Sequence, residues 1–308
     1  MNGYGRRGNW FQQQRLGLTL VGAVFAAALL PVLYMVFDTQ APPPVDSSNC
    51  LLDRPPVSHT VVLVDGTDKL EKNQADVVLA VVANEAHAVP PYGKITIATI
   101  DQDHPYTPRI LFTSCAPKNR QDADWLSENP EVFGTFWQQK FDRPLMLAAQ
   151  QSAMTDGQKS TPLVESIFGL SLRTDFDSDV KNRRLVIVSD MLQNTELYTH
   201  YKGVPGFAAF LQRKDAFQDV PNLKGVTVVA RYLIRPQSMQ YQSEAQKQFW
   251  RDYFDATQAE VKIEGWPWRT LKEWHAAVVA AQPAPGHAVR HRRRKSADEA
   301  SNGGATRP

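Results

Sequence analysis

Apolar residues follow two kinds of pattern along this chain. Short continuous apolar runs, rich in β-branched residues, predict strands at 60–64, 94–100, 109–112, 184–188, 225–233 and 260–263. Longer segments with apolar residues at helical spacing predict helices at 70–88, 125–151, 162–172, 206–214 and 243–257. Strands that alternate with helices indicate an α/β fold, in which a doubly wound, mostly parallel sheet has helices on both faces.

Two pairs of prolines refine this prediction. Pro105 and Pro108 lie in a turn between the apolar runs 94–100 and 109–112, so these runs are expected to form a hairpin with one antiparallel pair. Pro130 and Pro144 lie within the helical segment 125–151, and we expect them to interrupt it.

The N-terminal part of the chain contains a long uncharged run, residues 16–37. As a transmembrane helix it spans roughly 33 Å, enough for a bilayer core and longer than the apolar region of a cleaved signal peptide, which is the alternative. Residues 1–15 carry three arginines and Asp38 follows the run, so the positive-inside rule places the N-terminus in the cytoplasm. We therefore expect a single-pass inner-membrane protein with a periplasmic body.

The rest of the chain divides into a spacer, one folded body and a tail. Residues 38–56 are rich in proline and predict an extended spacer, and residues 57–268 suit a single α/β domain. Residues 283–308 carry +4 without hydrophobic periodicity, which predicts a disordered basic tail, either solvated or in contact with anionic lipid or cell-wall polymer. Because the whole chain carries +2 and residues 1–15 carry +3, the middle is acidic, at about −5, and no nucleic-acid partner is expected.

The chain has two cysteines, Cys50 in the spacer and Cys115 after the run 109–112. An oxidising compartment permits a disulfide between them, which would tie the spacer to the body; two free thiols are the alternative. The seven histidines are scattered without the spacing of metal ligands.

Three short segments carry candidate chemistry. Asp65-Gly66-Thr67-Asp68-Lys69 follows the run 60–64, Ser160-Thr161-Pro162 opens a predicted helix, and Ser189-Asp190 follows the run 184–188. Asp65 and Asp190 thus lie at the carboxyl ends of predicted parallel strands, where open α/β sheets bind ligands. Two carboxylates with nearby hydroxyl groups suit a hard cation that prefers oxygen ligands.

In their order and neighbours these segments resemble a von Willebrand factor A domain, over roughly residues 57–265. The resemblance implies a divalent cation, Mg²⁺ or Mn²⁺, with Asp65, Thr67, Thr161 and Asp190 as its direct or water-mediated ligands. It also implies one coordination position for an acidic group of a partner, and a short antiparallel edge strand where the hairpin is predicted.

Two residues depart from that family's pattern. Lys69 stands where domains with a complete site have Ser, and Met191 stands where many have Gly. An ammonium group has no lone pair and repels a cation. The alternative to metal binding is therefore a metal-free site, in which Lys69 bridges Asp65 and Asp190 in an internal ion pair.

Catalytic motifs are incomplete in this chain. Val64-Asp65-Gly66-Thr67 is similar to part of a haloacid-dehalogenase phosphatase motif, but Leu63 stands at the position of the nucleophile. A metal-dependent nuclease is disfavoured by the predicted location and by the acidic body. We therefore expect a non-enzymatic binding or scaffold protein of an envelope-associated assembly, with protein partners in the cell envelope. A membrane-tethered metal-dependent hydrolase or nuclease is the alternative.

Overall fold

The computed structural model describes residues 7–37, 43–124, 128–154, 157–213 and 220–264. Within these ranges six strands form one sheet in the order β3-β2-β1-β4-β5-β6. Every neighbouring pair is parallel except β2 and β3, which are antiparallel, with a register shift between Ile97 and Ala98. The predicted α/β class with a mostly parallel sheet is therefore confirmed, and so is the predicted hairpin.

The strands begin and end close to the predicted apolar runs. Their bounds are β1 His59–Val64, β2 Lys94–Thr99, β3 Arg109–Cys115, β4 Arg183–Ser189, β5 Val226–Tyr232 and β6 Glu260–Glu264. All six residues of β1 are buried, as expected of a central strand that is covered on both faces. The β6 strand pairs only with β5 and forms one edge of the sheet, while β3 forms the other.

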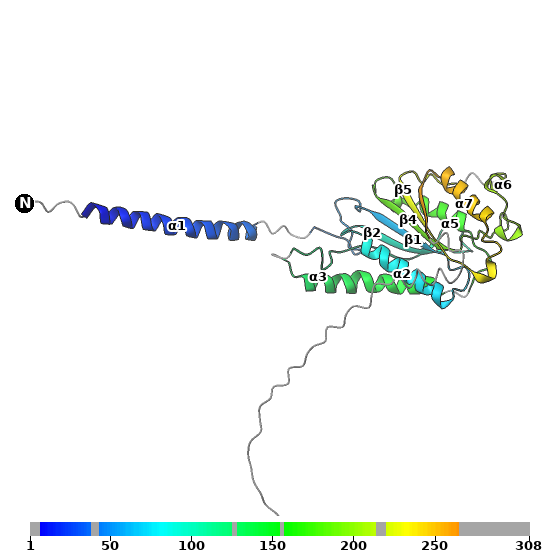
Figure 1. The fold of residues 1–308 in the computed structure, drawn as a ribbon, viewed down its shortest axis with the longest axis horizontal. Coiled ribbons are helices and arrows are strands. Elements are labelled where there is room, and N and C mark those ends of the chain that lie inside the picture. The colour runs from blue at the N-terminus through cyan, green and yellow to red at the C-terminus, as the bar shows by residue number, and fades with distance from the viewer. Residues whose placement is uncertain (1–6, 38–42, 125–127, 155–156, 214–219, 265–308) are drawn as a thin grey trace, which may run out of the picture. The chain divides into compact units, whose positions relative to one another are not determined.

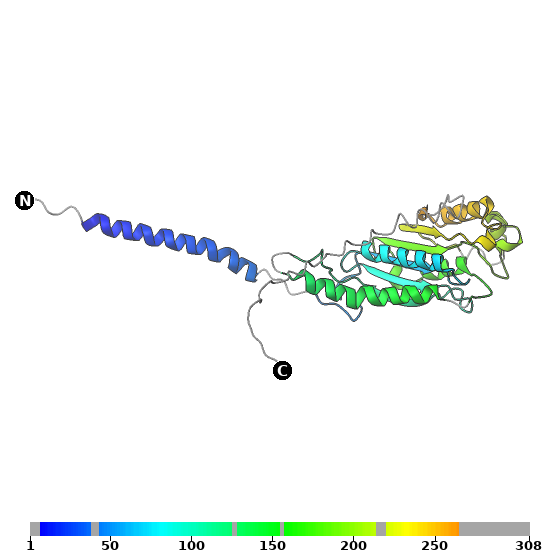
Figure 2. The same ribbon diagram turned by 60° about the horizontal axis from the view of Figure 1, so that its bottom comes forward.

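Helices cover both faces of the sheet (Figures 1 and 2). On one face α2 (Lys72–Ala88) packs against α4 (Arg143–Ala153), and both contribute to a core that includes Val62, Val64 and Ile97 of the strands. On the other face α5 (Leu163–Ser171), α6 (Phe207–Leu211) and α7 (Glu244–Ala256) close a second core. The alternation of strand side chains between the two faces explains why one buried strand supplies both cores.

The second core is dominated by aromatic side chains from α7. Phe249, Trp250, Tyr253 and Phe254 are all fully buried, at a spacing that places them on one side of the helix. Phe249 and Tyr253 make edge-to-face ring contacts with Phe210 of α6. This aromatic cluster fixes α7, whose partners at the end of β4 are described below.

Of the two predicted interruptions, the one at Pro144 does not occur, because helical structure is continuous from Pro130 to Ala153. Asn129 caps α3 (Pro130–Trp137) by accepting a hydrogen bond from the backbone of Glu131, so Pro130 begins this helix rather than breaking it. A short π-helix, Gln138–Asp142, then leads directly into α4, where Pro144 lies in the first turn. The wider π turn accommodates a proline that cannot donate a backbone hydrogen bond, so the helix continues.

The regions outside the body were predicted from composition. Residues 7–37 form one helix, α1 (Arg7–Phe37), which includes part of the predicted tail 1–15 and ends where the apolar run 16–37 ends. Among the described residues, no helix combines the length and the apolar character needed to cross a membrane. The anchor therefore stays a prediction. The predicted tail 283–308 lies outside the described residues.

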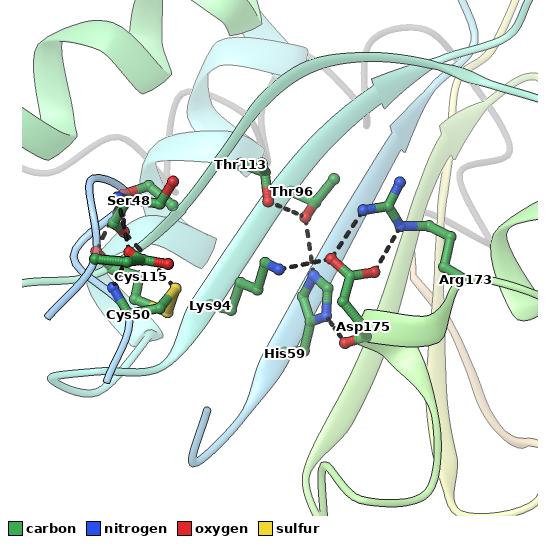
Figure 3. Close-up of a disulfide and its surroundings, with 11 residues drawn as sticks. Ser48, Cys50, His59, Lys94, Thr96, Thr113, Cys115, Arg173 and Asp175 are labelled. Carbon is green, nitrogen blue, oxygen red and sulfur yellow. Dashed lines mark hydrogen bonds and ion pairs between the residues drawn. A yellow bond between two sulfur atoms is a disulfide. The ribbon is translucent and has the colours of Figure 1, made fainter. Parts of the chain in front are cut away.

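The end of the spacer is joined to the sheet. Cys50 and Cys115 form a disulfide in the structure, with sulfur atoms 2.05 Å apart (Figure 3). The backbone N–H of Cys115 also donates to the carbonyl of Ser48, and so does the Ser114 hydroxyl group. Cys115 lies opposite Lys94, at the amino end of β2. The spacer therefore meets the body at the end of the sheet where the parallel strands begin. We call this end the amino edge, and the opposite end the carboxyl edge; neither term refers to the edge strands β3 and β6.

Candidate functional site

The candidate site lies at the carboxyl edge of the sheet, where the parallel strands end. From β1 the chain continues to β2 and β3 on one side, whereas β4 leads to β5 and β6 on the other side. The neighbours β1 and β4 therefore flank the switch point of the topology, which is the usual ligand-binding position of such sheets. Asp65 follows β1 and Asp190 follows β4, so the fold brings these two predicted site residues to one place.

The Asp65 carboxylate is the centre of a closed set of hydrogen bonds. Its Oδ1 accepts from the Thr67 hydroxyl group at 2.6 Å and from the Thr67 backbone N–H at 3.1 Å. Its Oδ2 accepts from the Ser189 hydroxyl group at 2.6 Å. Since the Thr67 hydroxyl has only one proton, the Thr161 hydroxyl, 2.7 Å away, donates to Thr67. The fold therefore brings Asp65, Thr67 and Thr161, three of the predicted cation ligands, into one buried cluster.

The Asp190 carboxylate is held by different partners. Its Oδ1 accepts from the backbone N–H of Leu192 at 2.9 Å, and its Oδ2 lies 2.5 Å from Nε of Arg235. Asp190 is 2% exposed and Arg235 is fully buried. Arg235 Nε is also 3.8 Å from Oδ2 of Asp68, whose side chain is nearly half exposed. The principal partner of Asp190 is therefore a buried guanidinium group from the loop after β5.

The electrostatics of this cluster are unbalanced. Burial, together with the neighbouring charge of Asp65, raises the pKa of Asp190 well above its usual range, and Arg235 only partly opposes this shift. Burial by itself would lower the pKa of Arg235, but the charges of Asp190, Asp65 and Asp68 outweigh it, and the pKa is raised. The positive charge of Arg235 therefore offsets part of the negative charge of both Asp190 and Asp65, and the guanidinium stays charged at any ordinary pH.

The loops around Arg235 and Asp190 are fastened to each other. The Gln242 side chain accepts from the backbone N–H of Arg235 at 2.9 Å and donates to the carbonyl groups of Leu233 and Asp190. Trp250 of α7 donates to the carbonyl group of Met191 at 2.6 Å. These contacts fix the loop of Arg235 to the loop of Asp190, and fix the loop of Asp190 to α7.

Met191 adopts a strained backbone at this site. Its φ is 61°, in the left-handed region, where a residue with a Cβ is disfavoured by about 1–2 kcal/mol. Glycine, which has no Cβ, adopts this conformation without that cost. The buried Met191 side chain and the hydrogen bond from Trp250 keep the loop in this shape.

Lys69 does not make the predicted bridge. Its side chain is exposed, and it makes no ion pair among the described residues. Asp65 takes its hydrogen bonds from hydroxyl and backbone groups, while Asp190 pairs with Arg235 instead. The physical reason is burial. The side chain of Arg235 is buried next to Asp190, whereas the side chain of Lys69 lies in the turn after β1 and is exposed to solvent.

Arg235 was not among the predicted site residues. A signal was nevertheless present, because Arg235 comes directly before Pro236 and follows the predicted strand 225–233, so it also lies beyond a carboxyl end. The rule that selected Asp65 and Asp190 selects this position too. Among the described residues, no group of three or more His, Cys, Asp or Glu side chains is placed to hold a metal.

Comparison with known proteins adds no family to this description. No model of a known protein family matches the chain, and no curated protein matches it.

Proposed function

We propose that this chain is a non-catalytic, membrane-anchored binding or scaffold protein of an envelope-associated assembly, with a von Willebrand A-like domain in the periplasm. The observation that carries the proposal is that hydrogen bonds and one ion pair within the protein engage both strand-end carboxylates. Asp65 and Asp190 use all four of their oxygens on groups of the protein itself. Carboxylates engaged in this way are poorly placed to activate a water molecule or a metal-bound nucleophile.

Three features support a von Willebrand A-like domain. The sheet order places the switch point between β1 and β4, and β3 is an antiparallel edge strand. Asp65 and Asp190 lie at that switch point. Thr161 reaches Thr67 from the segment before α5, although the two residues are 94 positions apart in the chain.

A binding role is tested by asking which edge of the sheet meets a partner in the cell. Lys69 and Lys181 are both exposed lysines, but Lys69 follows β1 at the carboxyl edge and Lys181 precedes β4 at the amino edge. We expect a photo-crosslinking amino acid at position 69 to yield a discrete adduct with an envelope protein, and the same amino acid at position 181 to yield none. Equal labelling at both positions would contradict a recognition surface at the carboxyl edge.

The alternative, a membrane-tethered metal-dependent hydrolase or nuclease, makes a different prediction. Its turnover of phosphodiesters or phosphomonoesters with Mg²⁺ or Mn²⁺ would be abolished by Asp65→Ala and by Asp190→Ala. We expect the purified wild-type chain to show no turnover for these variants to lose. Turnover that both variants remove would establish the alternative and end the proposal of a scaffold.

The proposed anchor rests on the uncharged run 16–37, which lies wholly within α1. We expect alkaline extraction of membranes to leave the full chain in the membrane fraction. A reporter active only in the periplasm, fused after residue 282, should give signal. Release by alkali would contradict the anchor, and a signal from a cytoplasm-only reporter would contradict the orientation.

A further inference from the structure

We infer that Arg235 replaces the divalent cation at this strand-end site, so that the domain carries its own cation and binds no metal there. The inference rests on the proposed function only in taking the carboxyl edge as the functional site. It concerns the chemistry of Asp65, Asp190 and Arg235 themselves, and it is tested without a partner.

Groups of the protein already occupy the carboxylate oxygens of Asp65 and Asp190. A hard cation needs lone pairs from Asp65 and Asp190. Both oxygens of Asp65 already accept from the hydroxyl groups of Thr67 and Ser189, each at 2.6 Å. Both oxygens of Asp190 are engaged as well, one by the backbone of Leu192 and one by Arg235. Lone pairs remain on three of these four oxygens, so a divalent ion would have to share the carboxylates with these groups, and on Asp190 it would meet the cation already in place.

The charge of Arg235 also opposes a metal ion at this site. A guanidinium group does not lose its proton at accessible pH, so Arg235 cannot make room for a metal by becoming neutral. Its Nε lies 2.5 Å from Asp190, and a divalent ion bound to the same carboxylate would be a like charge within a few ångströms. Arg235 is fully buried, so a metal could enter only after the side chain had left the interior.

Arg235 is held mainly by charge. Its Nη1 and Nη2 atoms have no hydrogen-bond partner among the described residues, although they are buried, and its closest contact is the one from Nε to Asp190 at 2.5 Å. A guanidinium whose only role was to hydrogen-bond its surroundings would be badly placed. As a positive charge beside two buried carboxylates it is well placed, and Gln242 fixes its backbone to the loop of Asp190.

The test compares divalent-ion binding by full-length wild type and by Arg235→Met, which keeps the bulk of the side chain and removes the charge. Thermal unfolding in detergent is measured in EDTA, Mg²⁺ and Mn²⁺, and Mn²⁺ binding is measured directly by electron paramagnetic resonance. Arg251→Met, which removes an exposed arginine of α7, is the matched control.

We expect wild type and the Arg251→Met variant to bind no Mn²⁺ at this site and to unfold at the same temperature in all three solutions. The Arg235→Met variant should unfold at a lower temperature in EDTA. It should gain at least about 5 °C when Mn²⁺ is about 100-fold above its Kd. Adding Asp65→Ala should remove that gain.

Two results would overturn the inference. One is Mn²⁺ binding by wild type that Asp190→Asn abolishes, because a metal would then coexist with Arg235. The other is an Arg235→Met variant that gains no Mn²⁺ binding, including one that stays unfolded whether or not Mn²⁺ is present. The Arg235→Lys variant, which keeps a cation, should fold and remain insensitive to Mn²⁺. These results do not depend on the crosslinks at position 69, so failure of this inference and failure of the proposed function are distinguishable.

Discussion

The amino and carboxyl edges of the sheet neutralise their charged side chains to different extents. At the amino edge Asp175 lies between Lys94, at 2.6 Å, and Arg173, at 2.8 Å, and Glu85 is paired with both Nε and Nη2 of Arg184. At the carboxyl edge the buried carboxylates of Asp65 and Asp190 lie near one buried guanidinium, that of Arg235, which contacts Asp190. Stability alone would favour the first arrangement, and the second is the kind of perturbed electrostatics that is enriched at functional sites, which agrees with the proposed role of this edge.

The amino edge also satisfies its buried histidine completely (Figure 3). His59 Nδ1 donates to the carbonyl group of Asp175 at 2.8 Å, which leaves Nε2 to accept from the Thr96 hydroxyl at 2.8 Å. Thr96 in turn accepts from Thr113 at 2.9 Å. Each polar group in this chain of contacts has a partner, and the arrangement holds β1, β2, β3 and the 3-10 turn Thr174–Phe176 together.

The largest expected effect comes from breaking the shared charge at the carboxyl edge. Arg235→Met leaves two buried carboxylates without a cation, and we expect it to lower the free energy of unfolding by up to about 5 kcal/mol. The double variant Arg235→Met, Asp190→Asn should recover much of this loss, because it removes one charge of each sign. Urea unfolding checks both values, and strictly additive losses would show that the two side chains are not coupled.

The next effect belongs to the disulfide at the amino edge. Replacing Cys50 and Cys115 by Ser opens a link between residues 65 positions apart, and the loop-entropy relation gives a loss of about 4 kcal/mol. Hydrogen exchange should accelerate in β3 and leave the loop of Asp190 unchanged. Free Cys50 and Cys115 thiols in non-reduced wild type would contradict this prediction.

A smaller effect concerns acid and His59. Burial lowers the pKa of His59 to about 4, whereas an unfolded histidine titrates near 6.5. The neutral imidazole therefore contributes stability that is complete above pH ~6.5 and is lost as the pH falls toward about 4, on the order of 3 kcal/mol in all. The His59→Gln variant should lack this part of the pH dependence in urea unfolding curves. His104→Gln, at an exposed position, should behave as wild type.

The smallest effect tests the balanced carboxylate of the same edge. Burial would raise the pKa of Asp175, but Arg173 and Lys94 outweigh it and lower that pKa to about 2. Asp175 thus contributes stability above its unfolded pKa, near 3.9, and loses it as the pH falls through about 2. We expect Asp175→Asn to cost about 2 kcal/mol at pH 7 and almost nothing at pH 2. Asp179→Asn, an exposed neighbour, is the control; an equal loss for Asp175→Asn at both pH values would exclude a role for charge.

Local pattern predicted most of the fold. The apolar runs at 60–64 and 184–188 fall within β1 and β4, because a strand buried on both faces must be apolar throughout. The predicted break at Pro144 was wrong, because the π turn before α4 accommodates a proline that local rules treat as a helix breaker.

In the candidate site, too, some features follow from the local sequence and others only from the tertiary structure. The sequence by itself determined that Asp65 and Asp190 end buried strands and that Thr161 precedes a helix, since each of these facts depends only on neighbouring residues. Only the tertiary structure decided which cation lies beside Asp190. Lys69 is close in sequence but lies in an exposed turn, whereas Arg235 arrives from the loop after β5, the strand that pairs with β4. That choice depends on which side chain is buried when the sheet forms, and burial is a property of the assembled fold.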